Sequence, residues 1–394
     1  MILSEEGTTQ GDPLAMPMYA IGVVPLIREF SLLHATQVWF ADDATGSGKL
    51  ARLKDWWALL NEKGPNYGYF PKAVKTCLLV KASLLEEATK FFGDSGMQIE
   101  TDSCRLLGAA LGSTEFLPQF MHQKINSFAE LVLELSSVAR SQPHAAYAAL
   151  MHGLMGKWTF PSRTMGAVIN QLLQPLEKVI RQQLIPTLTD CDLPSHQERR
   201  LLALPVRLGG LGIKDLTSSV MSEYENSQRI TSPPTKVLLE QCENILPVCS
   251  EVSDLRAKVK LEKRAHELSL ARELREEAGP ELQHSMLLAG EKGASNWLSA
   301  LPLQWYGFTL YKSAFRDALC LRYGWLPTNL PDHCVCGQGF SVDHALSCST
   351  GGIPFIRHNS VRDLTADLLG EVCHDVVVGP RLQPLSGESL VGRT

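Results

Sequence analysis

Two adjacent carboxylates, Asp42 and Asp43, are the residues of this chain whose types and spacing best suit chemistry. They follow a short apolar run that begins at Gln37, and small residues from Ala44 to Gly48 come next. This pattern predicts a β-hairpin over residues 36–48 that carries both acids at its tip. Carboxylate oxygens are preferred ligands of magnesium, and paired divalent ions promote nucleotidyl transfer. An Asp-Asp pair without further context is more often an ordinary solvated turn.

Three cysteines and a histidine near the C-terminus form a second group with the spacing of metal ligands. They follow the pattern Cys-x-Cys-x7-His-x3-Cys and are Cys334, Cys336, His344 and Cys348. Three thiolates and an imidazole can close a tetrahedral shell around zinc, and such a closed shell is structural rather than catalytic. The gap between the first two cysteines is short, so His333 or His358 could replace one ligand. The alternative interpretation is a set of buried cysteines beside a hydrogen-bonded histidine.

The amino-acid composition limits the classes of protein to which the chain can belong. A chain of 394 residues with 44% hydrophobic and 20% charged residues suits a globular protein of two or three domains. The net charge of -5 lacks the basic excess of a strong nucleic-acid binder. Most of the ten cysteines are scattered, which favours a reducing compartment over a disulfide framework. No secretory signal opens the chain, and the apolar stretch at 13–27 is too short to cross a bilayer. We therefore expect no membrane association and a nuclear or cytoplasmic location.

The acidic pair lies within an ordered series of motifs. The series covers residues 5–112 and includes Gln10-Gly11-Asp12-Pro13-Leu14, Phe40-Ala41-Asp42-Asp43, Lys75-Thr76 and Leu107-Gly108. Its order and spacing resemble the second half of the reverse transcriptase palm of non-long-terminal-repeat (LINE-like) retrotransposons. In that family a Lys-Thr strand and a Leu-Gly turn follow the acidic hairpin. The resemblance extends to a glycine-rich turn at 204–213, which follows the thumb, and to the Cys-Cys-His-Cys knuckle after the polymerase.

The resemblance implies RNA-directed DNA polymerisation with magnesium or manganese as cofactor. Asp42 would coordinate the metal directly, and Asp43 would be the second carboxylate, closer to the primer end. Lys75 would lie near the phosphates of the incoming nucleotide, with Lys72 as the weaker choice. The implied partners of the full-length parent are an RNA template, a DNA primer and deoxynucleoside triphosphates.

The resemblance also implies residues that shape the substrate pocket. Gln10 and Gly11 would shape the site of the templating base and nucleotide, where close approach to the backbone favours a glycine. Ala41 would leave room for the primer. Asp12, before a proline, is expected to be a turn or cap residue.

The expected fold is α+β and predominantly helical. A partial palm sheet at 1–115 is followed by a helical thumb at 116–232, a helical connector at 233–332 and a zinc knuckle at 333–350. The remainder, 351–394, resembles the start of a restriction-like endonuclease domain that is truncated. The first motif lies almost at Met1, before which the family has a further carboxylate strand and the fingers. We therefore expect a fragment that is inactive when expressed alone.

Individual elements are also predicted. The apolar pattern predicts a buried helix near 13–27, a helix over 49–63 and a strand over 74–81. Ser232-Pro233-Pro234-Thr235 is the best linker candidate, and 251–278 is expected to be a charged helix packed by one face. The segment 297–323 should be helical, with aromatic residues that belong to the core rather than to a stacking platform. These aromatic residues are Trp305, Phe308, Tyr311, Phe315 and Tyr323.

Two alternatives to an active polymerase remain. One is a non-catalytic nucleic-acid-binding remnant of a retroelement, held together by the helices and the zinc knuckle. The other, a viral RNA-dependent RNA polymerase, uses a similar acidic pair. The Gln-Gly-Asp-Pro motif and the C-terminal knuckle argue against the viral enzyme.

Overall fold

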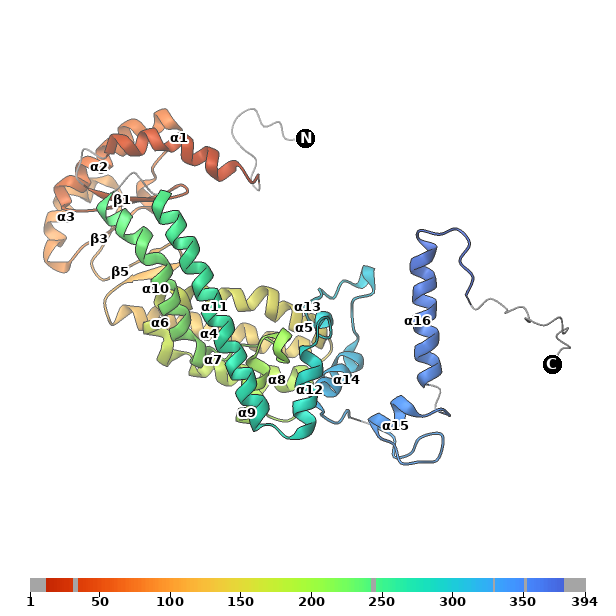
Figure 1. Ribbon diagram of the computed structural model, residues 1–394. Helices are drawn as coiled ribbons and strands as arrows, with labels where there is room; N and C mark the ends of the chain where they lie inside the picture. Colours follow the sequence, from red (N-terminus) through yellow and green to blue (C-terminus); the bar gives the residue numbers. More distant parts are fainter. Residues whose placement is uncertain (1–11, 31–34, 242–245, 329, 351–352, 379–394) are drawn as a thin grey trace. The chain divides into compact units, whose positions relative to one another are not determined.

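The computed structural model describes residues 12–30, 35–241, 246–328, 330–350 and 353–378. The chain divides into two compact units, Met1–Trp325 and Leu326–Thr394. Helices predominate in both, and the strands are short (Figure 1). The expectation of a predominantly helical α+β protein is confirmed. Within the described residues, no helix is both long and apolar enough to cross a membrane.

The N-terminal part of the first unit alternates helices with short strands. In chain order these elements are α1 (Ala15–Glu29), β1 (Thr36–Phe40), β2 (Asp43–Ser47), α2 (Leu50–Lys63), β3 (Cys77–Leu79), α3 (Leu85–Phe92), β4 (Gln98–Glu100), β5 (Ser103–Leu106) and β6 (Ala109–Gly112). β1 pairs with β2 and β5 with β6, both antiparallel, whereas β3 and β4 pair in parallel across α3.

The described strands form three separate two-stranded sheets. The partial palm sheet expected over residues 1–115 is therefore divided into separate pairs of strands. The expected strand over 74–81 is reduced to the three residues of β3, between short 3₁₀ turns. Each of the two hairpins closes over a two-residue turn. The strands then end after three to five residues, before a third strand can be added.

A helical body completes the first unit. Its helices are α4 (Phe116–Ala139), α5 (Pro143–Ala149), α6 (Met155–Ile169), α7 (Gln174–Val179), α8 (Ile185–Thr189), α9 (His196–Ala203), α10 (Leu216–Glu240), α11 (Leu246–Glu277), α12 (Pro280–Gly290), α13 (Asn296–Ser299) and α14 (Lys312–Tyr323). One large core lies between α4 to α8, α10 and α14. α10 packs on α6 and also along α11, beside which it runs (Figure 1).

The second unit is smaller and has little apolar core. It contains α15 (Val342–Ser347) and α16 (Ile353–Gly370), and Ala345 and Cys348 are its buried residues in the described part. With so little apolar surface removed from water, folding of the segment before α16 needs another source of free energy.

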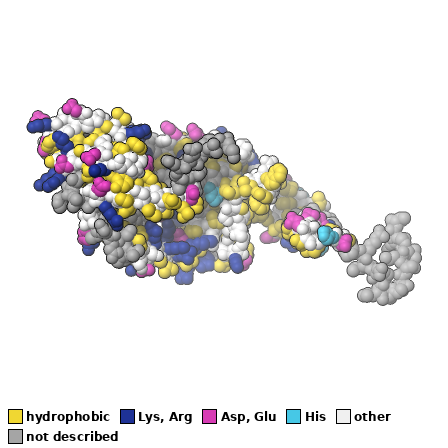
Figure 2. Space-filling view, turned by 90° about the horizontal axis from the view of Figure 1, so that it is seen from above, with side chains coloured by type: hydrophobic (Ala, Val, Ile, Leu, Met, Phe, Trp, Pro, Cys, Tyr) yellow, Lys and Arg dark blue, Asp and Glu magenta, His cyan; other side chains and the backbone are white. Residues whose placement is uncertain are grey.

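The prediction that the helix near 13–27 is buried is wrong. α1 forms there, but only Val23 and Leu26 are buried along it. Ile21 is 73% exposed and Met18 58% exposed. Hydrophobic side chains are visible on the face of the first unit that carries α1 (Figure 2). The apolar composition predicted a helix correctly, but burial depends on what packs around that helix.

The expected linker at 232–235 is also not found. Pro233 and Pro234 lie inside α10, and the helix continues to Glu240. Proline has no backbone N–H group, so the two prolines remove two helix hydrogen bonds, and the loss is destabilising where the freed carbonyl groups are buried. Here the neighbouring residues are exposed or only half-buried, so water can solvate the freed carbonyl groups.

The aromatic segment at 297–323 is only partly as expected. Phe315 and Tyr323 on α14 are buried and belong to the core. Trp305, Phe308 and Tyr311 are exposed, so their assignment to the core is wrong. They lie on the irregular stretch between α13 and α14, which turns at Gly307 in the left-handed region, so no continuous helix brings them onto one buried face.

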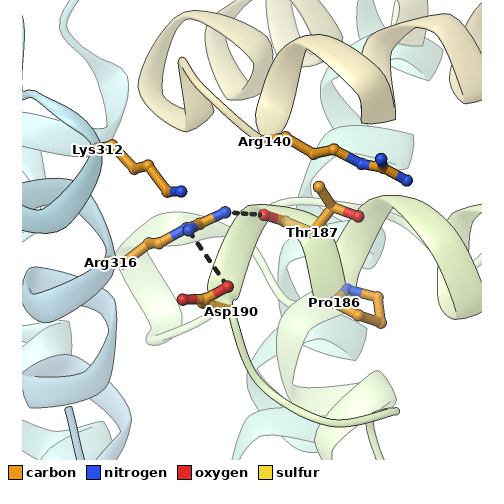
Figure 3. A pocket seen from close by; sticks show the side chains of 6 residues that line it. All are labelled: Arg140, Pro186, Thr187, Asp190, Lys312 and Arg316. Atoms are coloured by element: carbon orange, nitrogen blue, oxygen red, sulfur yellow. Dashed lines mark hydrogen bonds and ion pairs between the residues drawn. The ribbon is translucent and has the colours of Figure 1, made fainter. Parts of the chain in front are cut away.

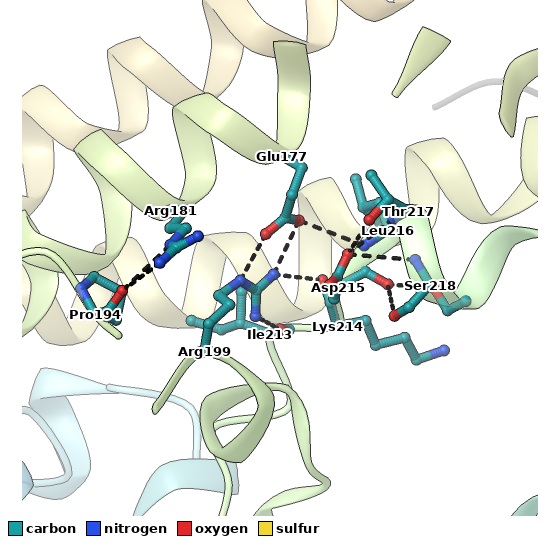
Figure 4. Close-up of polar contacts among 11 residues, drawn as sticks. Glu177, Arg181, Pro194, Arg199, Ile213, Lys214, Asp215, Leu216, Thr217 and Ser218 are labelled. Carbon is teal, nitrogen blue, oxygen red and sulfur yellow. Dashed lines mark hydrogen bonds and ion pairs between the residues drawn. The ribbon is translucent and has the colours of Figure 1, made fainter. Parts of the chain in front are cut away.

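A buried ion pair joins α7 to α9. The Nε atom of Arg199 donates to one Glu177 carboxylate oxygen at 2.6 Å, and its NH2 group donates to the other at 3.0 Å (Figure 4). The same guanidinium also donates to the backbone carbonyls of Ile213 and Lys214. Arg199 therefore connects two helices to the segment that begins α10.

The glycine-rich turn at 204–213 is confirmed, and its glycines have a steric reason. A Cβ atom on Gly210 would lie 1.9 Å from the carbonyl oxygen of Leu204. Gly209 adopts a φ of 95°, in the left-handed region. Arg322 of α14 donates to the carbonyls of Val206 and Gly210, so this turn is held from both sides.

We expect Arg199→Met to lower the free energy of unfolding by about 3–5 kcal/mol, because it leaves the Glu177 carboxylate buried and unpaired. The double variant with Glu177→Gln should recover part of that loss. Chemical denaturation measures both.

The matched control is Arg200→Met on the same helix, where the arginine pairs with exposed Glu273 and Glu277. A loss from Arg199→Met no larger than that from the control would contradict the role of the buried pair.

Candidate functional sites

The two acids lie at the tip of the β1–β2 hairpin. Phe40 pairs with Asp43, so Ala41 and Asp42 form a two-residue turn. Ala41 has a φ of 53°, and a positive φ at the first turn residue is typical of a type II′ hairpin turn. Both carboxylate side chains are exposed. The predicted hairpin with acids at its tip is confirmed, whereas their catalytic role stays a prediction.

A buried glutamine holds the base of this hairpin. The Gln37 side-chain amide donates to the Ile27 carbonyl of α1 at 2.9 Å. Its oxygen lies 3.1 Å from the indole nitrogen of Trp39 and 3.4 Å from that of Trp56 on α2. Buried polar groups of this kind are costly unless paired. One side chain therefore ties the hairpin to both flanking helices.

The hairpin is also joined to the helical body. Gln241, the residue after α10, accepts a hydrogen bond from the Gln37 backbone at 3.1 Å and donates one to the Gln37 carbonyl at 3.1 Å. The two glutamines are 204 positions apart in the chain. The sequence carries no signal for this pairing, and neither glutamine was a predicted site residue.

Tyr69 supports the turn itself. Its hydroxyl donates to the backbone carbonyl of Asp42 at 3.0 Å, and its ring contacts Trp39 edge-on. Burial, with Tyr19 adding to it, raises the pKa of Tyr69 to about 12. The hydroxyl is therefore protonated near neutral pH and can donate this hydrogen bond. The sequence analysis did not identify Tyr69.

The hairpin tip opens onto a cleft of about 910 Å³. Asp42 and Asp43 line it together with three cationic residues, Lys72, Lys75 and Arg105. The predicted Lys75 thus shares a cleft with the predicted acids. None of these cations is in ion-pair contact with either acid within the part of the chain that the structure describes. Arg105 was not predicted and comes from β5.

The cleft also contains the thiols of Cys77 and Cys104. Burial and the neighbouring Cys104 raise the pKa of Cys77 to about 11. The Cys77 thiol therefore stays protonated near neutral pH and is a poor nucleophile.

Four further residues were predicted at or near this site: Gln10, Gly11, Asp12 and Ala41. Ala41 is in the turn, as described above. Gln10 and Gly11 lie outside the described residues, so their predicted role in the pocket stays a prediction. Asp12 accepts a hydrogen bond from the Leu14 backbone at 2.8 Å, just before α1. Its expected role as a turn or cap residue is confirmed.

The four predicted ligands of the second unit converge. The ligand atoms of Cys334, Cys336, His344 and Cys348 all lie within 4.8 Å of one another. The Cys334 and Cys348 sulfurs are 3.8 Å apart, and the Cys336 sulfur is 3.1 Å from Nε2 of His344. Zinc–sulfur bonds of about 2.3 Å give a tetrahedral edge of about 3.8 Å. The group could therefore hold a zinc ion if the Cys336 sulfur and Nε2 of His344 move slightly apart.

Local backbone structure brings these ligands together. Gly337 has a φ of 88°, and its amide donates to the Cys334 carbonyl. This turn reverses the chain direction directly after Cys336, before the segment that carries His344 and Cys348. Ser341 accepts a hydrogen bond from the His344 backbone and begins α15, which carries the histidine. Neither His333 nor His358 belongs to the group among the described residues. The spacing therefore selected four side chains that lie together in the structure.

We expect Gln37→Met to weaken the hairpin, because it leaves the buried indole donor of Trp56, the half-buried one of Trp39 and the Ile27 carbonyl without this partner. Hydrogen exchange measured by mass spectrometry should show faster exchange across residues 36–47. Exchange within α5 and α6 should be unchanged.

The exposed Gln123 on α4, changed to Met, is the matched control. Exchange at the hairpin that is equal in both variants would show that Gln37 does not hold it.

Comparisons of the chain with protein-family models, with curated proteins and with solved structures gave no match.

Proposed function

We propose that this chain carries part of the palm of an RNA-directed DNA polymerase, of the retrotransposon type that its motifs resemble. The observation that carries the proposal is the hairpin tip with Asp42 and Asp43 open to a cleft that Lys75 also lines. Exposed carboxylates beside a basic cleft suit a magnesium–nucleotide complex, because the metal needs oxygens and the phosphates need cations.

Each part of the cleft has a role in this proposal. Asp42 and Asp43 hold the divalent ions, magnesium or manganese, that activate the primer hydroxyl and stabilise the leaving pyrophosphate. Lys75, with Lys72 and Arg105 nearby, binds the triphosphate. Ala41 leaves the turn narrow, so that a primer end can approach. Template RNA and primer DNA would be the partners of the complete enzyme.

The number of carboxylates limits what the described cleft can do. Among its described lining residues, Asp42 and Asp43 are the acids. Magnesium loses its water reluctantly and prefers several fixed oxygens, so two carboxylates hold it weakly. We therefore propose that polymerisation needs a further carboxylate, and that the chain studied alone is inactive or nearly so.

The metal site can be tested independently of turnover. Iron(II) replaces magnesium and, with ascorbate and peroxide, cuts the backbone nearby. We expect cuts around residues 40–45 and 68–75, which magnesium or manganese suppresses. Asp42→Asn and Asp43→Asn should each abolish most of this cleavage, whereas Asp94→Asn, an exposed acid outside the cleft, should not.

A primer-extension assay on a homopolymer template with magnesium or manganese is run on the same proteins. We expect no extension. Extension that disappears in Asp42→Asn would disprove the proposed inactivity but support the polymerase. Iron cleavage that is absent, or unchanged in both aspartate variants, would count against the polymerase itself.

We further propose that zinc is the metal of the Cys334–Cys348 group. The donor set of three sulfurs and one imidazole nitrogen is one that zinc prefers, and it leaves no open position for a substrate. Because the second unit buries so few apolar residues in its described part, metal binding would supply the folding free energy of this segment.

Metal analysis of reduced, unchelated protein should give about one zinc per chain. Cys336→Ala should lose it, and Cys373→Ala, at an exposed cysteine outside the group, should retain it. A chelator should raise hydrogen exchange across 332–348 without changing that of α4 to α8. A zinc content near zero in the unchanged protein would reject the site.

A second candidate function is a non-catalytic nucleic-acid-binding remnant of such an element. The closed Cys₃His group favours it, since knuckles of this kind bind nucleic acid without chemistry. Nucleic-acid binding together with no iron cleavage at the hairpin would select this function.

A further inference from the structure

Exposed aromatic side chains are concentrated on one stretch of the first unit. Trp305 is 92% exposed, Tyr311 72%, Tyr306 64% and Phe308 55%. Large aromatic residues are usually buried, and a group of them at the surface marks a binding site. The rings of Tyr306 and Phe308 are stacked with centroids 5.9 Å apart. This group, Trp305, Tyr306, Phe308 and Tyr311, is called the aromatic platform below.

The backbone beneath the platform is held in place. The Phe308 amide donates to the Leu303 carbonyl, and the Thr309 hydroxyl donates to the Pro302 carbonyl at 2.8 Å. The Leu310 amide donates to Nδ1 of buried His144 on α5 at 3.1 Å. The aromatic side chains are thus presented to solvent by an anchored loop.

A pocket of about 430 Å³ lies where this loop enters α14. Its lining comes from the end of α4, the end of α8 and the start of α14, and consists of Arg140, Pro186, Thr187, Asp190, Lys312 and Arg316 (Figure 3). Tyr311 of the platform directly precedes Lys312 in the chain. The loop that carries the platform therefore leads directly into the helix that lines the pocket with Lys312 and Arg316.

The charges of the pocket are not balanced. Arg316 is buried, donates to the Thr187 carbonyl at 2.7 Å and pairs with Asp190 at 3.2 Å, so these two charges compensate each other. Arg140 and Lys312 are exposed, and neither forms an ion pair with any described residue. Two cations are left available for an anion, although the chain as a whole has a net charge of -5.

We propose that the platform and the pocket form a binding site for single-stranded nucleic acid. Bases stack on Trp305 and its aromatic neighbours, and a backbone phosphate binds at the pocket that Arg140 and Lys312 line. Aromatic rings beside a basic groove are the combination by which proteins hold single strands without sequence preference. A duplex keeps its bases stacked inside, so it would leave the rings unused. The inference does not depend on the acidic hairpin or on polymerisation.

Fluorescence anisotropy with labelled dT8 and U8 tests this site, because such short strands cover little more than one platform. At low salt we expect Trp305→Leu to weaken binding about tenfold, since leucine keeps the apolar surface but has no ring to stack. Trp305→Phe should retain most of the affinity. It should also remove most of the quenching of tryptophan fluorescence that the strand causes.

The phosphate contact is tested by the double variant Arg140→Gln and Lys312→Gln. The slope of log affinity against log salt, which is negative, should become about 1.4 less negative, as expected for the loss of two contacts to a single strand. Lys236→Gln, an exposed lysine of α10, is the matched control and should not change the slope. Inorganic phosphate should compete only weakly, because it lacks the bases. The dT8 and U8 arms compare a DNA strand with an RNA strand.

The outcomes are decisive. Absence of dT8 and U8 binding by the unchanged protein, or equal affinity in Trp305→Leu, overturns the proposal. An unchanged salt slope in the double variant overturns the phosphate contact and with it the site. All substituted side chains are exposed, and circular dichroism and thermal melting confirm that each variant is folded.

Discussion

The bidentate contact between Arg199 and Glu177 is the interaction on which the rest of the first unit depends. Both side chains are nearly inaccessible, so each charge would be costly without the other. The guanidinium also binds the carbonyls that precede α10, and thereby sets where this 25-residue helix starts. Arg322 performs a similar function from α14 on the other side of the glycine-rich turn. Buried arginines thus join helices by satisfying loop carbonyls that water cannot reach.

The position of α10 in turn affects the hairpin that lines the candidate catalytic cleft. Gln241 at the end of α10 binds both backbone groups of Gln37, and Gln37 holds the two tryptophans that surround the acidic hairpin. A chain of hydrogen bonds and one long helix therefore connect the helical body to the hairpin base. Tyr69 adds a contact at the turn, so the carboxylates are exposed while their backbone is held. This is the arrangement that a metal site needs, because fixed oxygens bind a cation better than mobile ones.

The two candidate metal sites differ in what their geometry requires. The Cys₃His group is built from fifteen consecutive residues, Cys334 to Cys348, and its ligand atoms already lie together. The acidic cleft gathers residues from β2, β5 and the turn before β3, and it leaves its carboxylates open to solvent. A closed set of sulfur and nitrogen ligands suits a structural ion, whereas an open pair of acids beside lysines suits an exchangeable metal–phosphate complex.

The sequence by itself determined the features that depend on neighbouring residues. The hairpin tip, the glycine-rich turn, the charged helix α11 and the four Cys/His ligands were all predicted, because turn chemistry and ligand spacing act over a few positions. Only the tertiary structure decided burial and long-range pairing. In that structure α1 is largely exposed, α10 continues across Pro233 and Pro234, and the strands form small separate sheets. The tertiary structure also placed Trp305 in solvent and Gln241 beside Gln37. Periodicity identifies an apolar face, but what covers that face depends on contacts between segments far apart in the chain.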